Sequence, residues 1–365
     1  MIECKKDLRV GNVREEAVQQ LAGYVGERTA QLGQRYAGIL TDGAEWELYH
    51  LNPADGSIDL VSSVAIKPEA PNFEALLVWL EGVMSTAARL VPTPLEVERK
   101  LGATSPGFQL DLAELRDIYA FCRNDSEIRM KRELWARLLA AAFGTHFEDT
   151  DDLFIEHTYL VLTAETVAHA LVGFDLHGGI DPKALVTGEL FHQHEITGVV
   201  DADFFDWPVA TDRGAAFVRE LSRRLARFKW AEVDHDVLKV LYESVIDSDT
   251  RHALGEYYTP DWLAERMVSE VVDAPLEQRV LDPACGSGTF LFWAVRRYLN
   301  AAEAAGVPNP QALVGVTDHV FGIDPAGVPS PRSAMRGYPP SDAAVTRQRD
   351  AGLTRARARA RMTVH

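Results

Sequence analysis

Cysteines, long apolar runs and a leader pattern are all scarce or missing in this sequence. Its 365 residues include three cysteines, Cys4, Cys122 and Cys285, which are widely spaced and odd in number. They argue against a disulfide framework and a zinc site, and for a reducing compartment. No apolar run approaches the roughly 20 residues that a membrane helix needs, and the first residues carry no signal-peptide pattern. We therefore expect a cytoplasmic protein with no membrane partner.

Basic charge is scarce too. Lysine and arginine number 37 against 54 acidic residues, which gives a net charge of −17. A DNA-binding protein usually presents a basic face, and no such face is visible in the sequence pattern. Residues 325–365 are the exception, with eight arginines, no lysine and two aspartates. Net charge bears on solubility and non-specific attraction rather than on fold, so DNA binding is not excluded.

The hydrophobic pattern predicts an α/β protein with four regions. Residues 1–67 mix a helix over 13–32 with a hairpin, because an Asp42-Gly43 turn separates two strand-like segments. Residues 68–254 are mostly helical, with apolar helical spacing over 128–143, 154–172 and 217–242. This region carries few chemical signals and is expected to be a helical connector.

The third region, residues 255–324, alternates helix and strand. The pattern predicts a βαβ unit, the repeating piece of a doubly wound parallel sheet. Its elements are helices over 261–272 and 290–305 and strands over 279–281 and 320–323, the first of them buried. Residues 325–365 lose the apolar periodicity and gain proline, arginine and alanine, so no fixed structure is expected there.

The segment Asp282 to Phe290 (Asp-Pro-Ala-Cys-Gly-Ser-Gly-Thr-Phe) lies where the first strand ends and a helix begins. Gly286 and Gly288 allow a tight turn and the close approach of a ligand. The helix that follows presents unpaired N–H groups and the positive end of its dipole. Asp324, after the second strand, points to the same crevice, where a carboxylate can hold a ribose diol. Gly288 and Asp324 are farther apart than in the dinucleotide fingerprint, which disfavours a nicotinamide cofactor.

A third motif, Gly-Glu-Tyr-Tyr-Thr-Pro at residues 255–260, precedes the first helix. Its aromatic side chains can wall an apolar pocket, and the Thr259 hydroxyl can cap a helix or hold a carboxylate. Taken alone, a simple helix-entry loop explains it as well.

Together the three motifs resemble those of the adenine-N6 DNA methyltransferases of type I and type IIG restriction–modification systems. The resemblance covers about 70 residues and implies a partial Rossmann-like methyltransferase domain with S-adenosylmethionine as cofactor and double-stranded DNA as substrate. A specificity subunit or companion restriction–modification subunit is an implied partner. The implied cofactor-binding residues are Tyr258, Thr259, Pro260, Asp282, Ala284, Gly286, Gly288, Thr289, Phe290 and Asp324.

The family's catalytic Asn-Pro-Pro-Tyr motif, which holds the amine of a flipped-out adenine, is absent from this sequence. The two Asn-Pro pairs, at Asn52 and Asn309, continue differently. We therefore expect no residues for methyl transfer itself, and little or no transfer by this chain alone. The change of composition directly after Asp324 suggests that the tail from Pro325 is a frameshifted read-through.

Glu3-Cys-Lys5 near the start could supply a carboxylate for Mg²⁺ and a lysine beside the attacked phosphate of a nuclease. With Gln20 and Tyr24 on the next predicted helix and the hairpin that follows, it resembles the PD-(D/E)xK nuclease domain of restriction enzymes. The family's first metal-binding aspartate precedes Glu-x-Lys, where this sequence has only Met1 and Ile2. We expect a truncated nuclease-like lobe, with Glu3, Lys5 and Gln20 as a remnant and Mg²⁺ relevant only if the lobe were complete.

Five histidines of the connector are interpreted as core or surface residues rather than ligands, because no third ligand accompanies the His192-x-His194 pair: His157, His169, His177, His192 and His194. Cys285 is interpreted as a small packing residue. Two other functions stay open. One is a methyltransferase for protein, RNA or a small molecule, and the other is a non-catalytic S-adenosylmethionine-binding or scaffold protein.

Overall fold

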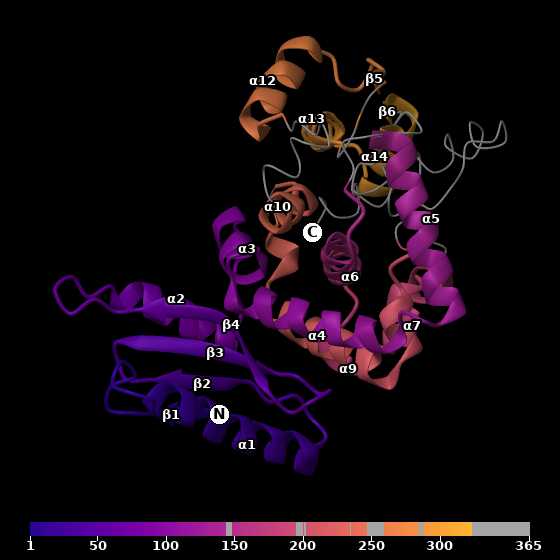
Figure 1. Cartoon of the computed structure of the whole chain (residues 1–365). Helices are drawn as coiled ribbons and strands as arrows, with labels where there is room; N and C mark the ends of the chain where they lie inside the picture. Colours follow the sequence, from indigo (N-terminus) through magenta and orange to yellow (C-terminus); the bar gives the residue numbers. More distant parts are fainter. Residues whose placement is uncertain are drawn as a thin grey trace.

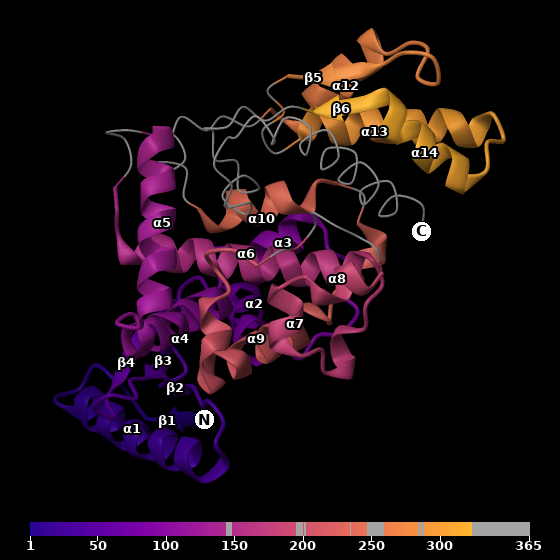
Figure 2. The same ribbon diagram turned by 90° about the vertical axis from the view of Figure 1, so that its right-hand side faces the viewer.

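The structure is a computed structural model that describes residues 1–143, 148–194, 200, 202–233, 235–246, 259–283, 285 and 288–322. It is a mixed α/β arrangement, mostly helical, with two small sheets. A four-stranded sheet lies at one end, a broad layer of helices follows, and the C-terminal elements lie at the opposite end (Figures 1 and 2).

The N-terminal sheet has the strand order β1-β2-β3-β4. β1 pairs parallel with β2, and the remaining pairs are antiparallel. The predicted hairpin is β2–β3, closed by Gly43 at φ 88° and by Asp42, whose carboxylate accepts from the amides of Ala44 and Glu45. The strands are β1 Ile2–Cys4, β2 Gly38–Thr41, β3 Glu45–Leu51 and β4 Ile58–Ala65.

Helices cover both faces of this sheet. Successive residues of a strand point to opposite faces, so neighbouring residues of β2 pack against different helices. Leu40 packs with the buried residues of α1 (Val13–Leu32) on one face. Ile39 packs on the other face with Trp79 of α2 (Phe73–Met84) and Leu110 of α4 (Pro106–Cys122). β2 is therefore buried along its whole length. α4 packs on the sheet and also forms part of the helical layer.

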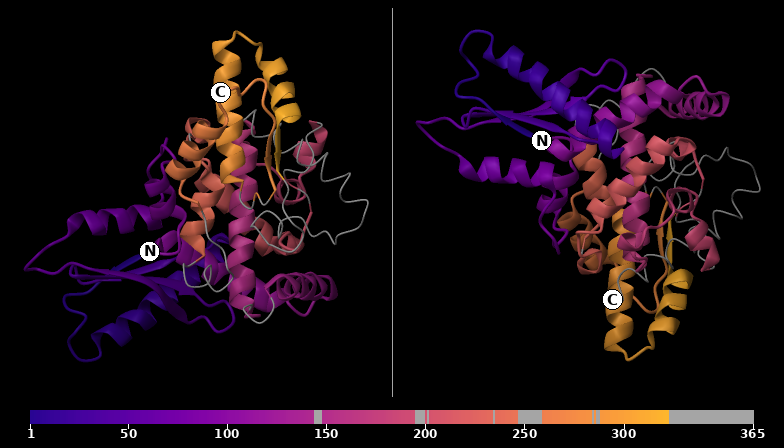
Figure 3. Two further views of the ribbon diagram at one scale, coloured as in Figure 1. Left: turned by 90° about the horizontal axis from the view of Figure 1, so that it is seen from above. Right: turned by 90° about the horizontal axis from the view of Figure 1, so that it is seen from below.

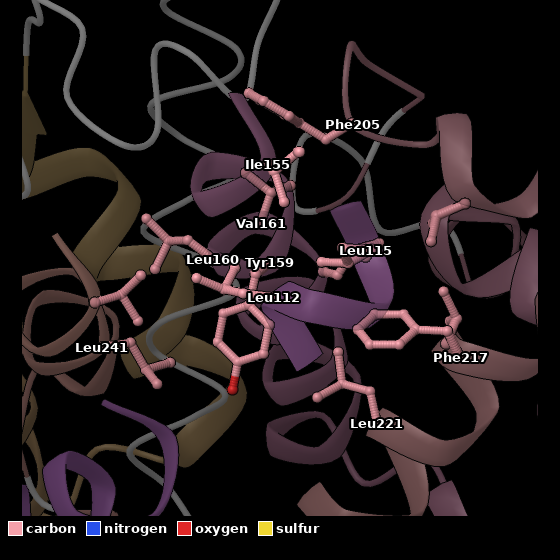
Figure 4. Close-up of a cluster of buried hydrophobic side chains, with 14 of the residues drawn as sticks. Leu112, Leu115, Ile155, Tyr159, Leu160, Val161, Phe205, Phe217, Leu221 and Leu241 are labelled. Atoms are coloured by element: carbon pink, nitrogen blue, oxygen red, sulfur yellow. The ribbon is translucent and has the colours of Figure 1, made fainter. Parts of the chain in front are cut away.

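The helical layer is built around α6 (Asp151–Leu171), which is buried on nearly all sides from Phe154 to His169. Figure 4 shows its side chains meeting Leu112 and Leu115 of α4, Phe217 and Leu221 of α9, and Leu241 of α10. The other helices here are α3 Pro94–Leu101, α5 Ser126–Phe143, α7 Pro182–Val186, α8 Glu189–Gln193, α9 Asp212–Leu225 and α10 Val237–Val245, with 3-10 turns η2 Leu176–Gly178, η3 Trp207–Ala210 and η4 Trp230–Glu232.

Side-chain caps fix where several of these helices begin. Ser105 accepts a hydrogen bond from the Phe108 amide, and Pro106 occupies the first turn of α4. Thr150 and Thr211 cap α6 and α9 in the same way. Each cap satisfies an amide that has no partner within its helix.

The C-terminal elements form a small α/β lobe with its own buried cluster, centred on Val295 and Val316. β5 and β6 make a parallel pair, as the predicted βαβ unit requires. The orange and yellow segments of this lobe project from the helical layer in the views of Figure 3. Its elements are α12 Asp261–Val271, β5 Val280–Asp282, α13 Thr289–Ala304, α14 Asn309–His319 and β6 Val320–Gly322.

Two expectations were wrong. The helical pattern expected over 217–242 is interrupted, since α9 ends at Leu225 and α10 begins at Val237. Leu90 pairs with the backbone between them: its amide donates to the Arg227 carbonyl at 2.9 Å and its carbonyl accepts from the Lys229 amide at 2.8 Å. The strand predicted as buried over 279–281 runs from Val280 to Asp282, and Leu281 is 57% exposed. One face of the small sheet thus has no cover within the described residues.

No helix in the described ranges is both long and apolar enough to cross a membrane.

Candidate cofactor site

The carboxyl ends of β5 and β6 lie side by side. Asp282, the last residue of β5, is in register with Gly322, the last residue of β6. In a parallel α/β sheet the ligand crevice lies beyond the carboxyl ends of the strands. The two strands therefore place Asp282 at the edge where a cofactor is expected.

Gly288 turns the chain from β5 into α13. It stands at the N-cap of α13 with φ 83°, a left-handed conformation that side chains other than glycine rarely adopt. Its amide donates to the Cys285 carbonyl at 2.6 Å, which closes a tight turn. The first amides of α13 and the positive end of its dipole consequently lie at the carboxyl end of β5, as an anionic or polar ligand requires.

Gly322 allows β6 to approach this turn closely. A Cβ atom at Gly322 would lie 2.4 Å from Leu291 Cδ1 and 3.1 Å from Cys285 Sγ. Glycine at position 322 thus has a packing reason, and Cys285 fills the space against it. The interpretation of Cys285 as a small packing residue agrees with this position.

The segment that enters α12 belongs to the same lobe. Thr259 is half-buried, Pro260 is the N-cap residue of α12, and Asp261 begins the helix. Farther along α12, Val268 packs in the cluster that also contacts Phe290 of α13. The helix that follows the Gly-Glu-Tyr-Tyr-Thr-Pro motif, α12, thereby packs on the helix that follows the glycine turn, α13.

Six of the ten predicted cofactor residues are described by the structure. Thr289 and Gly288 are buried, whereas Asp282 and Phe290 are partly exposed and Thr259 and Pro260 stand at the entry of α12. Four lie outside the described residues: Tyr258, Ala284, Gly286 and Asp324. The ribose-binding role of Asp324 and the pocket-lining role of Tyr258 therefore stay predictions.

A cleft of about 330 Å³ lies between α12 and α13, away from the predicted residues. Arg296 lies over the Trp293 ring at 5.6 Å, and the Arg297 side chain donates to the Val272 carbonyl. None of the predicted cofactor residues lines this cleft, so it is not the crevice at the strand ends. Its walls are Glu265, Val268, Ser269, Pro275, Trp293, Arg296, Arg297, Asn300 and Ala301.

At the other end of the molecule, the predicted nuclease residues come together. Lys5 Nζ lies 2.8 Å from Glu3 Oε1 and donates to Gln20 Oε1 at 2.8 Å. Gln20 in turn donates to the Tyr24 hydroxyl at 2.8 Å. The residues predicted as a nuclease remnant, together with Tyr24, thus form one connected group at the carboxyl end of β1 and on α1.

A second polar group was not anticipated from the sequence. His50 of β3 lies 2.8 Å from Asp117 of α4, and Glu114 lies on the same helix. Within the described residues, these three form the group in which side-chain ligand atoms lie close enough together to hold a metal ion. Arg213 of α9 donates to Glu114 Oε1 at 2.6 Å, to Glu114 Oε2 at 2.8 Å and to Asp117 at 3.2 Å. The guanidinium therefore neutralises the carboxylates that a metal would need.

Two of the histidines set aside in the connector are core residues. His157 and His169 of α6 are both buried, and burial lowers the pKa of each to about 4. The His169 ring nitrogen Nδ1 bonds the Glu165 carbonyl at 2.7 Å, while His157 packs edge-on against Trp135. Both are therefore neutral packing residues near pH 7.

One segment of the chain is similar to known proteins. The model of the family "N-6 DNA Methylase" matches residues 233–311. The type I restriction enzyme MjaVII methylase subunit of Methanocaldococcus jannaschii is 32% identical over 81 residues, which cover 22% of this chain and 14% of that relative. The methylase-like segment thus includes α10 as well as α12 and α13.

Among solved structures, the cryo-EM structure of a DrdV–DNA complex aligns with 92% of this chain and 30% of that chain. The sequence identity is 15% and the TM-score is 0.31. The chain spans less than a third of the length of either protein.

Proposed function

We propose that this chain provides the S-adenosylmethionine site of an adenine-N6 DNA methyltransferase of a restriction–modification system. The observation that carries the proposal is the parallel β5–β6 pair with α13 rising from a glycine turn at the carboxyl end of β5. This arrangement falls within and beside the segment that matches the N-6 DNA methylase family.

The residues present fit such a cofactor. Gly288 and Gly322 leave the backbone bare where a side chain would crowd the turn. The amino end of α13, with the positive end of its dipole, and the carboxylate of Asp282 lie at the carboxyl end of β5. When bound, S-adenosylmethionine supplies a methyl group on a positively charged sulfur. In the proposed site Asp282, Gly288, Thr289 and Phe290 hold it, and Asp324 holds its ribose.

The sequence contains no Asn-Pro-Pro-Tyr motif, the element that would hold the adenine amine that accepts the methyl group. Direct methyl transfer requires polar groups on the exocyclic amine of a flipped-out adenine and an aromatic ring stacked on the base. We therefore expect this chain to bind the cofactor without measurable methyl transfer. Double-stranded DNA and a companion restriction–modification subunit are the partners of the proposal.

Calorimetric titration of the chain with S-adenosylmethionine tests the cofactor site. The proposal expects saturable one-to-one binding that Asp282→Ala weakens and that the exposed control Asp273→Ala leaves unchanged. No binding by the wild-type chain would defeat the proposal. Equal binding by both variants would remove Asp282 from the site.

A labelled-methyl transfer assay addresses the substrate. Incorporation into mixed-sequence DNA by the chain alone would show that its acceptor site differs from the one proposed. Incorporation into protein, RNA or a small molecule instead would favour another methyltransferase class. Cofactor binding together with a gel shift of double-stranded DNA, but without transfer, is the expected pattern.

We also propose that residues 1–67 form a nuclease-like lobe without activity of its own. The connected group Glu3, Lys5, Gln20 and Tyr24 supports the nuclease-like part of this proposal. A nicking assay on supercoiled DNA with Mg²⁺ tests the rest. Cleavage by the wild-type chain that Lys5→Met abolishes would contradict it.

A further inference from the structure

Lys239 is a buried lysine in α10, with its side chain 6% exposed. Its ammonium donates to the Thr259 carbonyl at 2.7 Å and lies 3.4 Å from the carboxylate of Asp261. A buried ammonium group is costly unless it is paired and hydrogen-bonded, so these two contacts are what keep it stable there.

Both partners of Lys239 stand at the entry of α12. Thr259 precedes the N-cap residue Pro260, and Asp261 is the first residue of the helix. A carboxylate in the first turn is favourable with the helix dipole, and the Lys239 ammonium fixes that carboxylate in place. Lys239 thus acts on the backbone and the side chain of one short segment.

The contact also closes a loop. α10 ends at Val245 and α12 begins at Asp261, so Lys239 joins the helix before this stretch to the helix after it. The stretch contains the Gly-Glu-Tyr-Tyr-Thr-Pro motif at residues 255–260.

α10 itself is firmly placed. Leu241 and Tyr242, on the same helix, are buried in the core of the helical layer. Asp236 caps the helix through the Lys239 amide at 3.4 Å. The ammonium therefore extends from a rigid element toward the methylase-like lobe.

We infer that Lys239 is a positioning residue of the cofactor site, which holds Thr259 and the first turn of α12 in the binding-competent arrangement. This inference rests on the proposed function. Lys239 touches neither cofactor nor substrate in it. It acts by keeping the competent arrangement populated, and apparent affinity scales with that population.

The test compares Lys239→Met with Lys229→Met, a matched control at an exposed lysine that also pairs with a carboxylate, Glu232. Calorimetry gives the Kd for S-adenosylmethionine, and hydrogen exchange without cofactor reports on residues 255–262. Lys239→Met is expected to weaken binding by about tenfold, as the loss of a charged hydrogen bond would, and to speed exchange in that segment. Lys229→Met should change neither.

Asp261→Asn serves as a milder variant if Lys239→Met does not fold, since it keeps the Thr259 contact and loses the opposite charge. It should weaken binding by about threefold. Wild-type Kd in the folded variants, or unchanged exchange in residues 255–262, overturns the inference and leaves the proposed function standing. A wild-type chain that binds no S-adenosylmethionine removes the proposed function, and the inference with it.

Discussion

The guanidinium of Arg213 meets the carboxylate of Glu114 in a two-pronged contact, Nε to Oε1 at 2.6 Å and a terminal nitrogen to Oε2 at 2.8 Å. The pair joins α9 to α4, and the same guanidinium reaches Asp117, which holds His50 of the sheet. A second chain of ion pairs runs nearby, where Asp111 of α4 contacts both Arg35 and Arg224. The sheet and the helical layer are thus connected by charged groups as well as by apolar packing.

Replacing Arg213 with methionine should destabilise the fold. It removes the guanidinium that bonds both oxygens of the Glu114 carboxylate, which is 7% exposed, and leaves the Arg35 guanidinium 3.9 Å away. Breaking a buried pair costs about 3 kcal/mol or more, and because Arg213 is itself 37% exposed we expect about 2 kcal/mol. Urea denaturation measures the loss. Arg219→Met, on the exposed side of the same helix, should stay within about 0.5 kcal/mol, and similar losses in both variants would contradict the account.

Alanine at Gly288 should strain the turn into α13. Gly288 has φ 83°, and a left-handed conformation costs an ordinary residue about 1–2 kcal/mol. Gly288→Ala should therefore lower the free energy of unfolding by that amount, which urea denaturation measures. Gly23→Ala is the control, since Gly23 lies within α1 with open space around it. Gly23→Ala should raise the free energy of unfolding by up to about 1 kcal/mol. An unchanged free energy of unfolding in Gly288→Ala would contradict the strain at this turn.

His157 should make the fold sensitive to mild acid. Its pKa is about 4 in the folded state because it is fully buried, against 6.5 for an ordinary histidine. The unfolded chain therefore binds the proton first, so stability is full above pH 6.5 and falls as the pH drops toward 4, by about 3 kcal/mol. His157→Phe, which keeps a ring against Trp135, should make the fall in this window shallower, and the part that remains belongs to His169, whose pKa burial also lowers to about 4. His177→Phe, at an exposed position, should leave the profile unchanged.

Added Mg²⁺ should not stabilise the chain. Glu3 is already paired with Lys5, and Mg²⁺ relies on well-placed carboxylates and its own waters. A ligand that binds the folded state raises the unfolding midpoint, so melting curves with and without the ion are a direct measurement. If Mg²⁺ raised the unfolding midpoint of the wild type but not that of Glu3→Gln, β1 would carry a metal site.

Local patterns in the sequence were enough to predict the elements that carry the site. The helix predicted over 13–32 coincides with α1, and α12, β5, α13 and β6 follow the predicted order within a residue or two, whereas α14 between α13 and β6 was not predicted. Periodicity and glycine position are properties of neighbouring residues, so the sequence displays them directly. The same holds for the Asp42-Gly43 hairpin.

Contacts between distant segments could not be read in this way. The break between α9 and α10 pairs with Leu90, more than 100 residues earlier in the chain. The group of His50, Glu114 and Asp117 needs a strand and a helix to meet. Lys239 resembled any other helical lysine until its partners at the start of α12 were known. In each case the signal lies in tertiary packing and not in residue spacing.

The double contact of α4 determines which piece of this chain could be exchanged with a related protein. Leu110 of α4 packs on the sheet, while Leu112 and Leu115 face the helices around α6. A chimera joined after residue 67 would pair a foreign sheet with resident α2 and α4, and the apolar and charged partners of that sheet would no longer match. Joining after Cys122 instead would transplant the sheet with the helices that cover it, but would break α4 from α6. Recombination is therefore expected to succeed only between parents whose α4 sequences are compatible on both sides.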